Sequence, residues 1–234
     1  MFVDERGMFV AQRDGRGLGT AIISVCLVGT AIADGTLTLT APSMPALRIA
    51  IDQGGVDVPV TIWDDRLSAI DQGDEAEAWA TEWLSRERPG RYRLVRMPDD
   101  RQRRSKIGEG EVAFNDAYPF LVISEASLAD LNRRLAEPLP MNRFRPNVVL
   151  SGTAPYEEDG MDRFQIGGIA FHGTTRCLRC PTTATNQDTA ERGKEPLRTL
   201  ATYRRDPDGV VFGRNFNHAG TGRIAVGDAI RSGA

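Results

Sequence analysis

Thr36-Leu37-Thr38-Leu39-Thr40 alternates polar and apolar residues at every position. This period of two is the pattern of a half-buried β-strand, because successive side chains of a strand point to opposite faces of its sheet. Further segments with strand character are residues 47–51, 56–63, 92–97, 119–123, 147–150, 164–166 and 169–171. The sequence therefore predicts a mostly β protein.

Three short segments interrupt the strands with helical spacing. In residues 74–86 apolar side chains recur every three or four positions, and acidic residues gather near the N-terminal end. Ser127, followed by Asp130, resembles a capping box, which predicts a helix that begins at Ser127. Pro196 suits the first turn of a third short helix. The predicted fold class is mostly β, with α+β character from these helices.

The composition is that of an ordinary globular protein. Of the 234 residues, 41% are hydrophobic and 26% are charged. The net charge of −3 gives no electrostatic reason to bind nucleic acid or an anionic membrane. The uncharged run from Gly17 to Ala33 is short for a membrane-spanning helix, so we expect a buried strand there. We predict no nucleic-acid partner and no membrane.

The cysteines indicate a reducing compartment. The chain has three, an odd number, and two of them form a Cys-x-x-Cys. This does not resemble the disulfide framework of a secreted protein, and the charged N-terminus lacks the apolar core of a secretory signal. We therefore predict a cytoplasmic location.

The Cys-x-x-Cys formed by Cys177 and Cys180 has three interpretations. A zinc knuckle would need two more ligands, and the chain has only two histidines to offer. A thioredoxin-like dithiol would be expected at the start of a helix within an α/β pattern. A single thiolate would bind a soft transition metal, and Arg176 and Arg179 beside the pair would favour the ionised sulfur. The local sequence leaves all three open.

Residues 101–106 form a basic run that contains three arginines and a lysine. Such a run is typical of a solvated loop. It is also compatible with an electrostatic dock for an acidic electron-transfer partner.

A wider constellation resembles a known family. Residues 115–132 resemble the entry to a MOSC domain, the module shared by the C-termini of molybdenum-cofactor sulfurases. Residues 142–147 resemble its Asn-x-Phe-Arg-Pro-Asn motif, and residues 177–180 its Cys-x-Arg-Cys motif. Residues 195–204 resemble its Glu-Pro-Leu-x-Thr-Leu-x-x-Tyr-Arg helix. With a closing segment that ends at Asp228, the resemblance spans residues 114–228 in order. Within the family, the chain is similar to mitochondrial amidoxime-reducing components and their bacterial counterparts.

The resemblance implies two regions. Residues 108–234 would form a MOSC β-barrel with short peripheral helices, and residues 1–100 a MOSC N-terminal β-barrel region. Family members begin with a strand bearing Tyr-Pro-x-Lys-Ser, and an Asp-Arg pair precedes the segment that matches Met1-Phe2-Val3-Asp4. Neither motif stands ahead of that segment here. We therefore expect an N-terminally truncated chain with an incomplete first region.

The resemblance also implies a site. A molybdenum–molybdopterin cofactor would be bound with its metal on the thiolate of Cys180, which would be both metal ligand and catalytic residue. The family further carries an association with pyridoxal phosphate binding. The residues that would contact the molybdenum cofactor are Asp116, Ala117, Tyr118, Arg145, Asn147, Leu178 and Arg179.

The implied activity is that of a molybdenum-dependent oxidoreductase. It would reduce small N-hydroxylated substrates of the amidoxime or hydroxylamine type. Electrons would come from a separate donor, such as a ferredoxin, a cytochrome b5-like protein or a flavin reductase. The alternative is a non-catalytic module that binds the cofactor or carries sulfur on Cys180.

Overall fold

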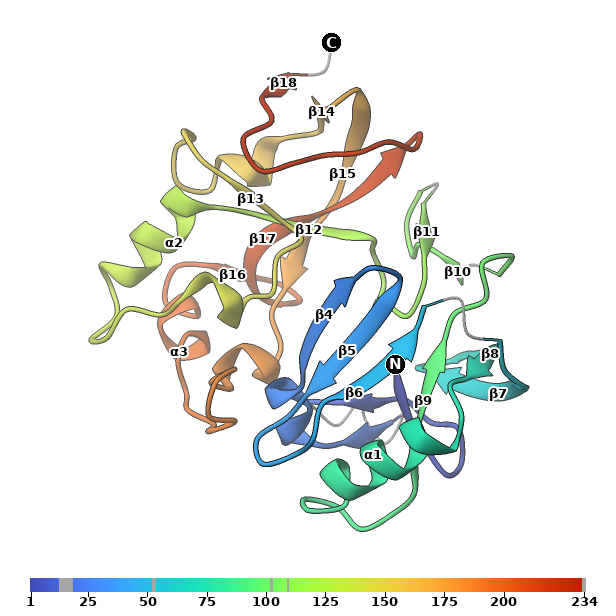
Figure 1. Ribbon diagram of the computed structural model, residues 1–234. Helices are drawn as coiled ribbons and strands as arrows, with labels where there is room; N and C mark the ends of the chain where they lie inside the picture. Colours follow the sequence, from blue (N-terminus) through green and yellow to red (C-terminus); the bar gives the residue numbers. More distant parts are fainter. Residues whose placement is uncertain (13–18, 52–53, 102, 109, 233–234) are drawn as a thin grey trace. The chain divides into compact units, whose positions relative to one another are not determined.

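The computed structural model describes residues 1–12, 19–51, 54–101, 103–108 and 110–232, and strands dominate it (Figure 1). The chain forms two compact units. Unit 1 consists of residues 1–101 and 185–192, and unit 2 of residues 102–184 and 193–234. The fold class is the predicted one, mostly β with three short α-helices. No helix within the described ranges is long and apolar enough to cross a membrane.

Unit 1 is built on two antiparallel sheets, with strand orders β1-β9-β8-β7 and β4-β5-β6, and a parallel pair β2-β3. Helix α1 is the 74–86 helix predicted from sequence, and it ends two residues earlier than expected. The elements are β1 (Phe2–Asp4), β2 (Val10–Ala11), β3 (Thr20–Ala21), a 3₁₀ turn (Ile23–Leu27), β4 (Gly29–Ala33), β5 (Thr36–Thr40), β6 (Leu47–Ala50), β7 (Asp57–Ile62), β8 (Asp65–Asp71), α1 (Asp74–Leu84) and β9 (Tyr92–Arg96).

The core of unit 1 follows the predicted pattern along β5 and α1. Leu39 is buried in β5, and Trp79, Trp83 and Leu84 form the buried face of α1. The prediction of a buried strand from Gly17 to Ala33 was wrong. Residues 17 and 18 lie outside the described ranges, and the remainder forms β3, the 3₁₀ turn and β4. All five residues of β4, one of the two edge strands of its sheet, are exposed.

Unit 2 is built around a seven-stranded sheet of order β13-β12-β17-β15-β14-β18, with β16 also paired to β17. Within it β12 and β13 are parallel and the other pairs antiparallel. Its elements are β10 (Arg103–Arg104), β11 (Glu111–Val112), β12 (Phe120–Ser124), α2 (Glu125–Asn132), a 3₁₀ turn (Met141–Arg143), β13 (Val148–Leu150), a 3₁₀ turn (Glu157–Gly160), β14 (Arg163–Ile166), β15 (Ile169–Leu178), a 3₁₀ turn (Pro181–Ala184), α3 (Leu197–Leu200), β16 (Arg205–Asp206), β17 (Gly209–Ala219) and β18 (Ile230–Ser232).

Strands β12 and β17 approach each other closely at Gly213. This residue has φ of 75°, and a Cβ there would lie 2.6 Å from the Cγ1 of Ile123 and 2.8 Å from the carbonyl oxygen of Val122. Only glycine fits both the left-handed backbone and the contact. Next to Gly213 in the chain, Phe212 packs against Phe144 with their ring centroids 4.4 Å apart. Both belong to a buried cluster that also contains residues of α2 and α3.

Helix α2 begins at Glu125, not at Ser127 as predicted. Its N-cap is Ser124, whose hydroxyl accepts a hydrogen bond of 3.0 Å from the backbone N–H of Ser127. The hydroxyl of Ser127 donates instead to the buried carboxylate of Glu158, at 2.9 Å. A partner distant in sequence thus decides which serine caps the helix.

Asp130 joins α2 to the segment after β13 and to α3. Its carboxylate accepts hydrogen bonds from Arg134 Nε (3.0 Å), Arg133 Nη2 (2.8 Å) and the Tyr156 hydroxyl (2.7 Å). The Tyr156 and Tyr203 hydroxyls lie 2.9 Å apart. The hydrogen bond from Arg134 is the main reason that the pKa of Asp130 lies below its ordinary value.

We predict that Asp130→Asn destabilises the protein in a pH-dependent way. A carboxylate with a lowered pKa contributes stability above its ordinary pKa of about 3.9, and this stability is lost as the pH falls through the folded-state value. The difference in free energy of unfolding between wild type and Asp130→Asn should therefore be largest near pH 7 and shrink below pH ~4. Urea titrations across this range measure it, with Asp208→Asn at an exposed turn as control. An unchanged difference at low pH would contradict the prediction.

Candidate functional site

Cys180 lies between the end of β15 and the 3₁₀ turn at Pro181–Ala184. Its backbone carbonyl accepts hydrogen bonds from the N–H (3.2 Å) and the hydroxyl (3.0 Å) of Thr183, which is itself buried. The thiol is half-buried and in no disulfide. The backbone of Cys180 is thus fixed by Thr183, whereas its sulfur forms no hydrogen bond with the described residues.

Arg179 holds this segment in place. Its backbone N–H donates to the Val210 carbonyl at 2.8 Å. Its Nη2 donates to the carbonyl of Phe144 at 2.8 Å, and Nη1 lies 3.0 Å from the Sγ of Cys177. The guanidinium also lies over the Phe144 ring, 5.6 Å from the centroid. Its Nε is buried and has no hydrogen-bond partner in the described part of the chain.

Arg145 is the residue after Phe144, whose carbonyl accepts a hydrogen bond from Arg179. It is exposed and adopts φ of 54°, a left-handed conformation that costs a non-glycine residue on the order of 1 kcal/mol or more. Asn147 fixes the next part of this segment to β12, because its N–H and its Oδ1 pair with the carbonyl (2.9 Å) and the N–H (2.8 Å) of Leu121. Asn147 therefore positions the backbone beside Arg145.

Asp116, Ala117 and Tyr118 form the segment that enters β12. The carbonyl of Ala117 accepts hydrogen bonds from the Lys106 N–H (3.1 Å) and the Ser105 hydroxyl (3.3 Å). Asp116 is exposed, and the other two are half-buried. Within the described ranges the backbone N–H groups of Ala117 and Tyr118 make no hydrogen bond.

The structure joins some of the predicted residues and separates others. Arg179 ties the Cys180 segment to the Phe144–Arg145 turn, and Leu178 is 51% exposed where β15 pairs with Val211. The Asp116 segment enters β12 at Phe120, which is level with Gly173 of β15 across β17. Cys180 lies a further seven residues along, roughly 20 Å at the usual rise of a strand. A meeting of the Asp116 segment with Cys180 stays a prediction.

The donor set favours one of the three interpretations of the Cys-x-x-Cys. Among the described residues, no group of three or more His, Cys, Asp or Glu side chains is arranged to hold a metal, so the zinc knuckle has no ligand set. A thiol with the guanidinium groups of Arg179 and Arg145 on the adjoining segments suits a soft metal carried by an anionic organic cofactor. These residues fit a molybdenum–pterin group.

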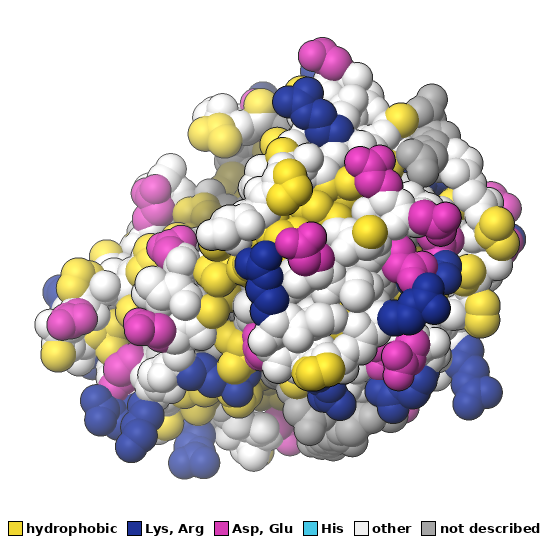
Figure 2. Space-filling view, turned by 60° about the horizontal axis from the view of Figure 1, so that its bottom comes forward, with side chains coloured by type: hydrophobic (Ala, Val, Ile, Leu, Met, Phe, Trp, Pro, Cys, Tyr) yellow, Lys and Arg dark blue, Asp and Glu magenta, His cyan; other side chains and the backbone are white. Residues whose placement is uncertain are grey.

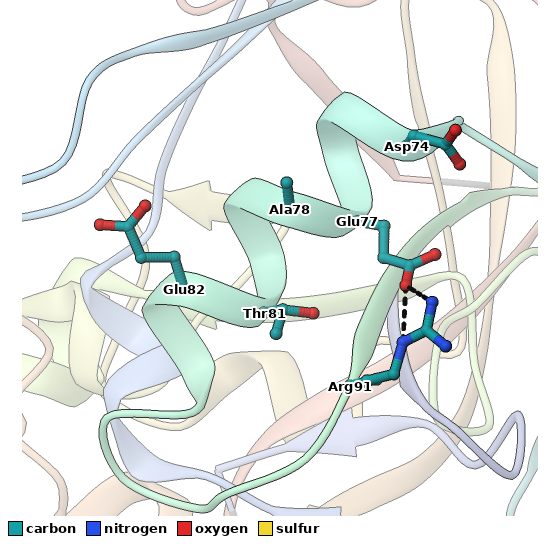
Figure 3. Close-up of a pocket in the computed structure, with 6 residues that line it drawn as sticks. All are labelled: Asp74, Glu77, Ala78, Thr81, Glu82 and Arg91. Carbon is teal, nitrogen blue, oxygen red and sulfur yellow. Dashed lines mark hydrogen bonds and ion pairs between the residues drawn. The ribbon is translucent and has the colours of Figure 1, made fainter.

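A hollow of about 560 Å³ lies elsewhere, on helix α1 of unit 1 (Figure 3). Asp74, Glu77 and Glu82 line it, and Arg91 pairs with Glu77. An excess of carboxylates repels an anion, so this hollow does not suit a phosphate-bearing cofactor. On the face shown in Figure 2, cationic and anionic side chains are interspersed.

Sequence analysis missed Arg103, which binds the backbone just before Asp116. Its Nη1 donates to the carbonyls of Ala113 (3.2 Å) and Asn115 (2.8 Å). The basic run at 101–106 was the signal, but its pattern does not say which arginine turns toward its own chain.

Comparisons with known proteins assign both parts of the chain. Residues 109–231 match the MOSC domain, and residues 1–87 match the MOSC N-terminal beta barrel domain. Human mitochondrial amidoxime-reducing component 1 is 39% identical over 180 residues, which cover 70% of this chain and 52% of that protein. The mouse protein of that name is 32% identical over an alignment of 248 positions, which covers 98% of this chain and 70% of that protein. Rat mitochondrial amidoxime reducing component 2 is 34% identical over an alignment of 255 positions, which covers 98% of this chain and 71% of that protein.

We predict that Arg179→Met lowers the free energy of unfolding by about 1.5–3 kcal/mol, because a charge-assisted hydrogen bond to the Phe144 carbonyl is lost. Arg176→Met, three residues earlier near the end of β15, is the matched control. It removes only a surface ion pair with Asp206, worth about 0–1 kcal/mol. Urea unfolding measures both, and equal effects would show that Arg179 does not anchor this segment.

Proposed function

Because the chain belongs to the MOSC domain family, we propose that it is a molybdenum-cofactor-dependent oxidoreductase that reduces N-hydroxylated compounds. Its relatives are named amidoxime-reducing components, which supports amidoximes and hydroxylamines as the substrate class. The observation that carries the proposal is the half-buried thiol of Cys180, which is in no disulfide and lies on a segment that Arg179 anchors to the Phe144 carbonyl. The predicted division into residues 1–100 and 108–234 remains part of the proposal.

In this proposal Cys180 supplies the thiolate ligand, on a backbone fixed by Thr183. Arg179 and Arg145 offer positive charge and hydrogen-bond donors to an anionic group. Asn147 holds the turn that carries Arg145. The remaining contacts come from Leu178 and from Asp116, Ala117 and Tyr118, whose segment offers backbone N–H groups.

When bound, the cofactor supplies two electrons and a Lewis-acid centre, so that an N–OH compound, two electrons and two protons give the N–H compound and water. The electrons come from a separate donor, a ferredoxin, a cytochrome b5-like protein or a flavin reductase. The cytoplasmic location stays part of the proposal, whereas the names of the relatives place those proteins in mitochondria. Pyridoxal phosphate is not included, because both lysines, Lys106 and Lys194, are exposed.

We expect Cys180→Ser to abolish molybdenum-dependent reduction, because a serine oxygen is a harder and far less acidic ligand than a thiol. Cys177→Ser should retain much of the activity, because a serine hydroxyl can still accept the hydrogen bond from Arg179 Nη1. Molybdenum content and turnover per bound molybdenum measure both variants. Equal loss in the two would contradict this division of roles.

Turnover separates the enzyme from the alternative, a module that only binds the cofactor or carries sulfur. With an amidoxime and a small artificial electron donor, the molybdenum-loaded protein should produce the amidine in amounts that exceed the protein many times over. A carrier would release at most one sulfur per chain and reduce no amidoxime. Loaded protein without turnover would overturn the proposed function.

A further inference from the structure

The β10–β11 hairpin carries the basic run that the proposed function does not use. Arg103 and Arg104 form β10 and pair with Val112 and Glu111 of β11. The two arginines differ sharply in what they contact. One nitrogen of Arg103, Nη1, donates to the carbonyls of Ala113 and Asn115, at 3.2 and 2.8 Å. Arg104 is exposed. Arg103 therefore binds its own chain, at carbonyls three residues and one residue before Asp116.

The same hairpin also binds the carbonyl of Ala117. The N–H of Lys106 and the hydroxyl of Ser105 both donate to the Ala117 carbonyl. The hairpin is fixed in turn by Asn217 of β17, a buried side chain whose Nδ2 donates to the Ile107 carbonyl at 2.6 Å. A Cβ at Gly110 would lie 2.6 Å from the Oδ1 of Asn217, so the hairpin backbone lies directly on this side chain.

These contacts occupy the carbonyls of the segment and leave donors on it. The carbonyls of Ala113, Asn115 and Ala117 are all bound by hairpin donors, whereas the N–H groups of Ala117 and Tyr118 are unpaired within the described ranges. Residues 113–119 have no regular strand or helix of their own, so their backbone is held by the hairpin contacts and by a longer hydrogen bond of 3.5 Å from Asn115 Nδ2 to the Pro119 carbonyl. A guanidinium also places positive charge next to a segment that offers N–H groups.

We propose that Arg103 is the positioning residue of the Asp116-Ala117-Tyr118 segment. It pins the backbone on which these residues stand, so that they are preorganised for the phosphate-bearing cofactor. This rests on the proposed function for the identity of the ligand. The effect of Arg103 on the backbone of residues 113–118 rests only on its hydrogen bonds and does not depend on which ligand binds. The basic run is accordingly divided: Arg103 faces its own chain, and the Arg104 and Lys106 side chains are exposed.

Three variants of the full chain test the proposal. Arg103→Met keeps the length of the aliphatic stem and removes the donors, Arg103→Lys keeps one charged nitrogen, and Arg104→Met is the matched control on the neighbouring residue. Two quantities are measured: hydrogen exchange of the Lys106 amide, whose N–H is bound to the Ala117 carbonyl, and the rate at which purified protein loses molybdenum. Turnover per bound molybdenum with an artificial donor is recorded beside them.

In Arg103→Met we expect exchange of the Lys106 amide and molybdenum loss to be faster on the order of tenfold, the effect of one charge-assisted hydrogen bond. Arg103→Lys should recover part of both, and Arg104→Met should equal wild type. In Arg103→Met, turnover per bound molybdenum should fall less than molybdenum retention does, because Arg103 acts through the backbone of residues 113–118 and not on the substrate.

The outcomes separate this inference from the proposed function. Exchange of the Lys106 amide that is no faster in Arg103→Met than in Arg104→Met overturns the positioning role, whatever the metal content. Faster exchange with wild-type molybdenum retention overturns the link to the cofactor. A wild-type chain prepared with cofactor that holds no molybdenum contradicts the proposed function, while the exchange data still decide whether Arg103 organises the segment.

Discussion

A guanidinium group cannot be withdrawn from water without partners, and this constraint shapes the candidate site. Arg179 meets it by binding the Phe144 carbonyl and the sulfur of Cys177, with its charge over the Phe144 ring. These contacts tie the end of β15 to the turn before β13. The neighbouring Cys180 is thereby held at a fixed place, with its thiol outside the network. Arg145, in a strained conformation on the other side of the Phe144 carbonyl, is placed by the same contact.

The elements of the fold were largely predictable, because alternation and helical spacing are local properties. β5 and α1 lie where the periodicity of residues 36–40 and 74–86 put them. The failures have non-local causes. Ser124 caps α2 because the Ser127 hydroxyl is bound to Glu158, which lies beyond β13. Residues 29–33 are uncharged but exposed, because a short uncharged run does not show whether other parts of the chain will cover its strand.

The candidate site was predictable only in part. The Cys-x-x-Cys and its flanking arginines are visible in the sequence, and family resemblance supplied the more distant residues. The sequence did not show the hydrogen bonds that join segments far apart in the chain. These are the bonds of Asn147 with Leu121, of Arg179 with Phe144, and of Arg103 with the carbonyls before Asp116. Each joins residues 10 or more positions apart, and no spacing rule predicts such pairs.

The account rests on a bond between molybdenum and the sulfur of Cys180. Molybdenum K-edge X-ray absorption on the loaded protein counts the sulfur atoms around the metal. We predict that wild type and Cys177→Ser show the same number of Mo–S contacts, and that any molybdenum retained by Cys180→Ser has one fewer. The same count in Cys180→Ser as in wild type would contradict the account, because the protein ligand would then not be this thiolate.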